Sequence, residues 1–364
     1  MKVFTCSACQ QMLFFESFEC TKCGHRLAYV SEHAVLTALD PAPAGPRPGE
    51  TFLALAPPIQ GERYRLCANA TQHAACNWAL PDADPAELCR SCRLNEMIPN
   101  LADAEARAGW LIMESSKRRL LYTLIELGLP VESRSERPQG GLAFAFLKED
   151  PAAREKVVFT GHDDGLITID LAEADAPFRE KTRQELGEAY RTLLGHFRHE
   201  IGHYYWSRLI SDSPWLPGFR ERFGDDSADY DRARQWHYEN GPPADWRSRF
   251  LSSYASMHPW EDWAETWAHY LHMVDTLETA RSFGLGLRPK LDAKAPKRSV
   301  ATRRLGYDDF DELMQTWVPL TMALNSLNRS MGLQDLYPFV VPTPAIEKLR
   351  FVHDVVEKSG AATR

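Results

Sequence analysis

The stretch His199-Glu200-Ile201-Gly202-His203 decides how the larger part of this chain is interpreted. Its two histidines are four residues apart, so on a helix they lie on one face, one turn apart. From that face both imidazoles can bind one zinc ion, and Glu200 can take a proton from a water molecule at the metal. The pattern also arises by chance, on a surface helix with two unrelated histidines, so the flanking sequence has to decide.

The sequence around this motif predicts a helix that follows a small sheet. Apolar residues recur at helical spacing from about Pro177 to Ile210, which predicts one long helix. Strands are predicted at Gly141–Leu147, at Val157–Phe159 and at Leu166–Leu171, with an Asp164-Gly165 turn before the last of them. We expect the Leu166–Leu171 strand to receive a substrate peptide by β-addition.

A catalytic zinc ion keeps three protein ligands and one open position, so a third ligand is required. The metzincin pattern is absent, because the residue six positions after His203 is Leu209. Glu261 and Glu265 are four residues apart and share one face of a predicted later helix. Either glutamate can serve as the third ligand, and the spacing does not order the two.

Together these motifs resemble the gluzincins, the thermolysin-like and lethal-factor-type zinc peptidases. The resemblance implies that Glu261 binds zinc and that Glu265 supports a zinc-binding histidine, while the reverse assignment stays open. It also implies that Tyr254, seven residues before Glu261, stabilises the oxyanion. The alternatives are an ordinary packed tyrosine and, as the oxyanion donor, His258. Three other histidines are expected to pack or to support ligands rather than bind the metal: His196, His269 and His272.

All eight cysteines lie in the first 92 residues. The pairs Cys6-x2-Cys9 and Cys20-x2-Cys23 are typical of a zinc ribbon, in which four thiolates surround one structural zinc ion. A redox dithiol pair is the alternative. A second zinc ion is predicted for a looser set, for which a group of free, partly buried cysteines is the alternative. This set is Cys67, Cys76, Cys89 and Cys92.

Composition excludes several classes of protein. The 364 residues are 44% hydrophobic and 25% charged, which is typical of globular domains. The net charge is −8, and neither cysteine-rich segment is basic, so nucleic-acid binding is not expected. A protein partner or a purely structural role is favoured for the ribbons. The sequence has neither an apolar run of about 18 residues nor a signal peptide, so we expect no membrane span and a cytoplasmic location.

The sequence predicts a cysteine-rich module followed by an α+β, zincin-like metallopeptidase domain that is mostly helical with a small sheet. The expected segments are a zinc ribbon (1–35), a Pro-rich connector (36–64), a second four-cysteine zinc site (65–100) and the metallopeptidase domain (101–364). Residues from about 100 onward are expected to fold alone. Nearly the whole chain resembles the bacterial zinc-binding metallopeptidases that carry an N-terminal zinc ribbon. The segments that carry this likeness are the ribbon, Trp110–Leu124, His199–Trp206 and Pro259–His272.

The predicted function is zinc-dependent hydrolysis of a peptide bond in a peptide or protein substrate. A zinc-bound water is the nucleophile, Glu200 is the general base and Tyr254 steadies the oxyanion. One catalytic and two structural zinc ions are expected. Two alternatives are a non-catalytic zinc-ribbon adaptor with a peptidase-like domain, and a peptidase that acts on DNA-bound proteins. The intact Glu200 argues against the first, and the lack of basic clusters argues against the second.

Overall fold

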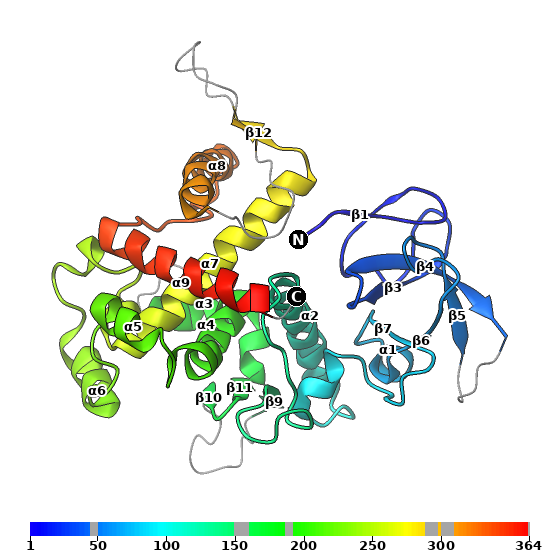
Figure 1. Ribbon diagram of the computed structural model, residues 1–364, viewed down its shortest axis with the longest axis horizontal. Coiled ribbons are helices and arrows are strands. Elements are labelled where there is room, and N and C mark those ends of the chain that lie inside the picture. Colours follow the sequence, from blue (N-terminus) through cyan, green and yellow to red (C-terminus); the bar gives the residue numbers. More distant parts are fainter. Residues whose placement is uncertain (44–49, 149–159, 186–191, 288–297, 300–308, 363–364) are drawn as a thin grey trace.

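The computed structural model describes residues 1–43, 50–148, 160–185, 192–287, 298–299 and 309–362. The N-terminal strands form one lobe and most helices form another, and helix α2 (Ala104–Glu126) lies between them (Figure 1). Asp103 caps the start of α2, because its carboxylate accepts hydrogen bonds from the backbone N–H groups of Glu105 and Ala106. The chain is therefore organised around a capped helix that touches both lobes.

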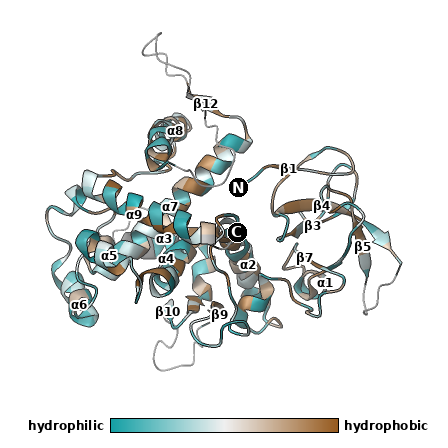
Figure 2. Cartoon of the chain, viewed as in Figure 1, coloured by the Kyte–Doolittle hydropathy of each residue, from teal (hydrophilic) through white to brown (hydrophobic). Residues whose placement is uncertain are grey.

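The N-terminal lobe contains a five-stranded antiparallel sheet of order β3-β4-β5-β6-β7. These strands are β3 (Arg26–Val30), β4 (Val35–Ala42), β5 (Thr51–Ala54), β6 (Arg63–Leu66) and β7 (Ala79–Pro81). The lobe also contains the antiparallel pair β1 (Phe4–Thr5) and β2 (Met12–Leu13) and helix α1 (Ala68–His73). Among the described residues of 36–64, for which the sequence predicted a connector, most of β4, all of β5 and the start of β6 are strand. Burial explains why this segment forms strands: a small hydrophobic core, separate from the main one, contains Leu39, Phe52 and Ile59. Figure 2 shows β3 and β4 as hydrophobic.

A second sheet has the order β10-β11-β9-β8, with β11 antiparallel to β10 and parallel to β9. Its strands are β8 (Asn95–Met97), β9 (Ala143–Leu147), β10 (Gly161–Asp163) and β11 (Leu166–Asp170). β11 is paired on both sides, so the expectation that it receives a substrate strand is wrong; among the described strands β10 and β8 lie at the two edges. Apolar patterning could not reveal this, since it does not name a strand's neighbours. The predicted strand Val157–Phe159 lies outside the described residues.

The helical lobe holds the motif helices. Its helices are α3 (Ala176–Glu185), α4 (Leu193–Tyr205), α5 (Leu216–Phe223), α6 (Tyr230–Asn240), α7 (Pro259–Ser282), α8 (Phe310–Ser330) and α9 (Thr343–Ala362), with a short strand pair of β12 (Gly286–Leu287) and β13 (Arg298–Ser299). The single helix expected from Pro177 to Ile210 is two helices, because Thr192 is extended and its hydroxyl caps α4 by accepting from the Gly195 N–H. None of the described helices combines the length and apolarity that a bilayer crossing needs.

The two lobes share one hydrophobic core. Phe15 and Tyr29 of the N-terminal lobe pack against Tyr122 of α2, with ring centroids 5.3 and 6.0 Å away. Arg118 of α2 donates a hydrogen bond to the backbone oxygen of Ala75. β8 also precedes α2 in sequence yet pairs with β9 of the second sheet. Packing, polar contacts and sheet pairing therefore all cross the expected boundary near residue 100.

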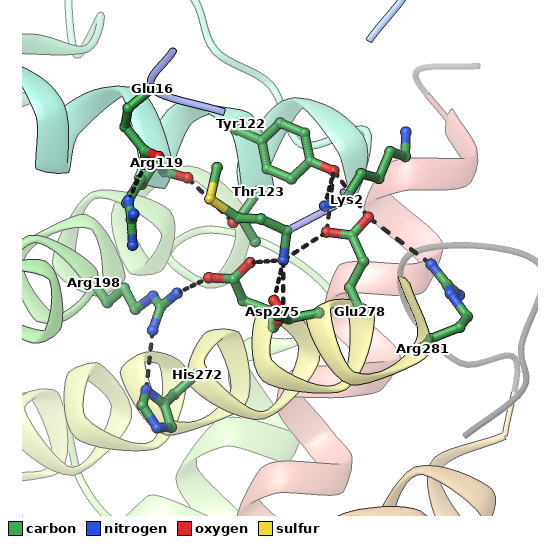
Figure 3. Close-up of polar contacts among 12 residues, drawn as sticks. Lys2, Glu16, Arg119, Tyr122, Thr123, Arg198, His272, Asp275, Glu278 and Arg281 are labelled. Atoms are coloured by element: carbon green, nitrogen blue, oxygen red, sulfur yellow. Dashed lines mark hydrogen bonds and ion pairs between the residues drawn. The ribbon is translucent and has the colours of Figure 1, made fainter. Parts of the chain in front are cut away.

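The first residue joins the lobes by charge, and Figure 3 labels its partners Asp275 and Glu278. The Met1 ammonium lies 2.8 Å from Asp275 Oδ1 and 3.1 Å from Glu278 Oε2, both on α7. Arg198 of α4 contacts the other Asp275 oxygen at 2.6 Å, and Tyr122 donates to Glu278 at 2.9 Å. These contacts link the start of the chain to the residue directly before His199.

Deletion of residues 1–100 is expected to leave residues 101–364 insoluble or unfolded. The deletion removes β8 and uncovers Trp110 and Tyr122, which are fully buried in the whole chain. The soluble fraction and the far-ultraviolet circular dichroism of the truncated chain test this expectation. Co-expression of residues 1–100 as a separate chain should restore solubility. A soluble fragment with a cooperative unfolding transition would restore the original expectation of an independent domain.

Candidate metal centre

Helices α4 and α7 touch at their backbones, and Gly202 makes this possible. A Cβ atom at Gly202 would lie 3.0 Å from Ala264 Cα and 3.2 Å from Trp267 Cβ. Trp263 adds a hydrogen bond from its indole N–H to the Gly202 carbonyl at 2.8 Å. The second turn of α7, which follows Glu261, is therefore held directly against the turn of α4 that carries the two motif histidines.

This contact brings three ligating atoms together. His199 Nε2 lies 3.2 Å from His203 Nε2 and 2.9 Å from Glu261 Oε2, and the last two atoms are 3.5 Å apart. Ligand atoms about 2.05 Å from a tetrahedral zinc ion would be about 3.3 Å from one another. The donor set of two imidazoles and one carboxylate also matches the ligands of catalytic zinc sites. The residues present therefore fit a zinc ion.

Outer contacts hold the three side chains in place. Glu265 accepts a hydrogen bond from His199 Nδ1 at 2.8 Å, and Ser252 donates to the other Glu265 oxygen at 2.6 Å. Burial opposes ionisation of Glu265, but His199 outweighs it and lowers the pKa of this carboxyl to about 2. The Tyr230 hydroxyl donates to Glu261 Oε1 at 2.8 Å. With Nδ1 donating, His199 directs its Nε2 lone pair toward Glu261 and His203.

Sequence reasoning missed Tyr230 and Ser252. Tyr230 is 31 residues before Glu261 and Ser252 is 13 before Glu265, and neither belongs to a recognisable motif. Only the packing of α6 and of the segment before α7 brings them to the centre. A polar residue at no fixed spacing from its partner gives no signal in a single sequence.

Glu200 lies beside the three ligating atoms and lines a cavity of about 480 Å³. Its side chain is buried, and its Oε2 atom has no hydrogen-bond partner among the described residues. Aromatic side chains form much of the cavity wall, including Trp246, Phe250 and Phe339. Glu200 thus lines a space large enough for a substrate side chain, and its buried Oε2 atom makes no hydrogen bond to the described residues.

Tyr254 lines the same cavity from the short 3-10 helix η5 (Tyr254–Ser256). Its ring centroid is 5.9 Å from that of His199. Burial, and after it the negative charge of Glu261, raise the pKa of Tyr254 well above its ordinary value. The phenol therefore keeps its proton at neutral pH and can donate it in a hydrogen bond.

The other candidate histidines contact groups other than the three ligating atoms. His258 caps α7: its Nδ1 accepts from the Trp260 N–H at 3.1 Å, and its Nε2 lies 3.0 Å from the Ala228 carbonyl oxygen. Both ring nitrogens are thus occupied by backbone, which argues against His258 as an oxyanion donor. His269 contacts the Tyr337 hydroxyl, His272 contacts Arg198, and His196 contacts Glu200.

The eight cysteines form two groups of four, in the sets that the sequence predicts. In the first group Cys6 and Cys23 are 3.7 Å apart at sulfur, and Cys9 and Cys20 are 3.6 Å apart. The second group consists of Cys67, Cys76, Cys89 and Cys92, all buried, with 3.6 Å between Cys76 and Cys89. Sulfur atoms around a tetrahedral zinc ion would be about 3.8 Å apart, whereas a disulfide bond is about 2.05 Å long. The spacing in both groups therefore supports zinc.

Comparisons with known proteins agree with this chemistry. A family model described as "Putative zinc-binding metallo-peptidase" matches residues 106–355, and a zinc-ribbon domain model matches residues 3–103. Uncharacterized proteins of Mycobacterium bovis and Mycobacterium tuberculosis are each 44% identical over 361 residues, covering 98% of this chain and 96% of theirs. No solved structure matches significantly. Because the first match spans more than half of the chain, including His199, His203 and Glu261, the chain belongs to the family that this model describes.

Proposed function

We propose that the protein is a zincin-like peptidase of the gluzincin type that hydrolyses peptide bonds in peptide or protein substrates. The observation that carries the proposal is the convergence of His199, His203 and Glu261 beside a buried Glu200. The hydrogen bond between Glu265 and His199 Nδ1 supports Glu261 as the zinc ligand and Glu265 as the residue that orients the ligand His199. A purely adaptor role would not account for a buried carboxylate oxygen that has no hydrogen-bond partner among the described residues, which costs free energy in the folded protein.

Zinc bound at these residues would polarise the scissile carbonyl and lower the pKa of the attacking water toward ~7. Glu200 accepts the proton of that water at Oε2 while the new C–O bond forms. Tyr254 donates a hydrogen bond to the developing oxyanion. Glu200 then delivers the proton to the leaving amine as the C–N bond breaks, which returns the carboxylate to its starting state.

We further propose that the two four-cysteine groups hold structural zinc ions. Four thiolates complete the coordination shell and leave no open position for a substrate. The N-terminal lobe would then stabilise the peptidase part, since the two share one core. A protein partner at the ribbon remains a secondary proposal, supported by the exposed side chains of Met12, Phe14 and Phe18.

Three zinc ions per chain are expected by elemental analysis of the purified protein. The ion at the histidine motif should leave first on treatment with a chelator, because an open site exchanges metal more easily than a closed thiolate cage. Cleavage of an unfolded protein substrate should stop when this ion is lost and should return when zinc is added back. A single zinc ion per chain would contradict the two cysteine sites. Absence of cleavage by fully loaded protein would count against the peptidase proposal.

Tyr254→Phe is expected to keep all bound zinc and to lower kcat by roughly 10²-fold, the usual cost of losing one oxyanion donor. Phenylalanine preserves the ring and removes only the hydroxyl. Tyr238→Phe, at an exposed tyrosine lining the same cavity, is the matched control and should keep most of its activity. Steady-state kinetics and zinc content of both variants test the assignment. Equal rates for the two variants would leave Tyr254 as a packing residue.

A further inference from the structure

The two oxygens of the Glu200 carboxylate have different surroundings, and His196 accounts for the difference. His196 precedes Glu200 by one turn of α4, and its Nε2 lies 3.3 Å from Glu200 Oε1. Oε2 has no hydrogen-bond partner among the described residues. One oxygen thus lies against an imidazole, while the other, which is also buried, makes no hydrogen bond to the described residues.

A second carboxylate faces the opposite side of the same imidazole. Glu173 Oε1 lies 3.7 Å from His196 Nδ1, and the Glu173 side chain is 5% exposed. Glu173 belongs to the short 3-10 helix η2 (Leu171–Ala174), which directly follows β11. Asp170 caps η2 by accepting from the Ala172 N–H at 3.0 Å, and Arg179 donates to the Glu173 backbone oxygen. The sheet and two capping contacts therefore fix Glu173 against the motif helix.

We propose that His196 is a positioning residue for the general base: as an imidazolium held between Glu173 and Glu200, it fixes Glu200 Oε1 and leaves Oε2 free for the proton. The inference rests on the proposed peptidase function. Two buried carboxylates on opposite sides of one imidazole favour its positively charged form, because each of them attracts that charge. A neutral histidine could orient Glu200 with one hydrogen bond but would lack this attraction.

The surrounding charges agree with a protonated His196. Burial alone would lower the pKa of His196, but Glu173 and Glu200 outweigh it and raise the pKa to about 9. Among the described residues, His162 of β10 also faces Glu200, and burial followed by His203 lowers its pKa to about 4. His162 is therefore neutral near pH 7. As pH rises through the pKa of His196, the imidazolium is lost and activity should fall on the alkaline side.

The charge on His196 can be measured without any substrate. Histidine-labelled, zinc-loaded full-length protein is titrated by nuclear magnetic resonance, and the spectrum of His196→Gln identifies the His196 signal. That signal should titrate well above the ordinary histidine value of about 6.5. In Glu173→Gln it should titrate at least about one pH unit lower than in wild type, because one carboxylate is lost. A wild-type signal that titrates near or below the ordinary value overturns the proposal.

Kinetics then separate positioning from simple packing. His196→Leu should lower kcat by roughly 10- to 100-fold with zinc content and KM unchanged, as for loss of a partner that orients a site residue. His196→Gln keeps a donor for Glu200 and should recover much of this loss near neutral pH. In Glu173→Gln the alkaline limb of the kcat profile should move to lower pH. Equal losses in the Leu and Gln variants, with an unmoved limb in Glu173→Gln, would overturn the proposal. If the wild type cleaves nothing, the titration alone decides the state of His196, and the peptidase proposal fails separately.

Discussion

Glu200→Gln is expected to bind zinc as fully as the wild type and to lose roughly 10²- to 10⁴-fold in kcat, the range for removal of a general base. Glutamine keeps the size of the side chain and can still contact His196, but it cannot accept a proton from water. Glu200 Oε2 is not among the three converging ligand atoms, so the metal has no reason to leave. Zinc analysis together with single-turnover cleavage of an unfolded protein substrate measures both halves of the prediction.

A surface substitution controls for the loss of one negative charge. Glu105, on the exposed side of α2, has an 87% exposed side chain, and Glu105→Gln should leave both zinc content and rate unchanged. Retention of full activity by Glu200→Gln would mean that another group takes the proton. Loss of zinc from this variant would mean that Glu200 is itself a ligand.

Glu261→Ala should empty the histidine site, whereas Glu265→Ala should weaken its zinc affinity by about 10- to 100-fold. The first change leaves two imidazoles, which is one protein ligand short of a catalytic zinc site. The second removes only the partner of His199 Nδ1 and keeps all three ligating atoms. Zinc content and competition with a chelator distinguish the two losses.

The cysteine groups provide an internal standard in both variants, since their zinc ions should remain in place. A drop of one zinc ion per chain in Glu261→Ala, with no drop at saturating zinc in Glu265→Ala, is the expected pattern. The opposite pattern would reverse the assignment of the two glutamates. Loss of all zinc in either variant would show unfolding rather than removal of a ligand.

The residues of the candidate site could be chosen from the sequence because helical spacing is a local property. Four-residue separation places His199 with His203 on one face, and Glu261 with Glu265 on another, whatever the rest of the chain does. Paired cysteines work in the same way, because the short separations in Cys6-x2-Cys9 and Cys20-x2-Cys23 already restrict the positions of their sulfur atoms. The distances between these groups were the part that required a structure.

Features that depend on distant partners could not be predicted. The proline-rich segment that contains Pro41 predicts a connector. In the structure Leu39 of β4 and Phe52 of β5 are buried in one small core, and these two strands pair. Thr192 interrupts a continuous helical pattern because its hydroxyl caps the start of α4. The spacing of apolar residues does not show whether such a residue continues a helix or begins a new one. Glu173 and Tyr230 reach the site only through the tertiary packing of their own elements.

The contact at Gly202 sets a condition for anyone who transplants this centre into another protein. Copying two histidines and a glutamate onto a host with ordinary helix spacing would leave the carboxylate too far from the imidazoles. The host must offer two helices at the short end of the usual 8–10 Å range of interaxial distances, with a glycine where they cross. Even alanine there would meet the opposing backbone at 3.0 Å. Gly202, which has no side chain, thus sets the distance between the two helices and with it the width of the metal site.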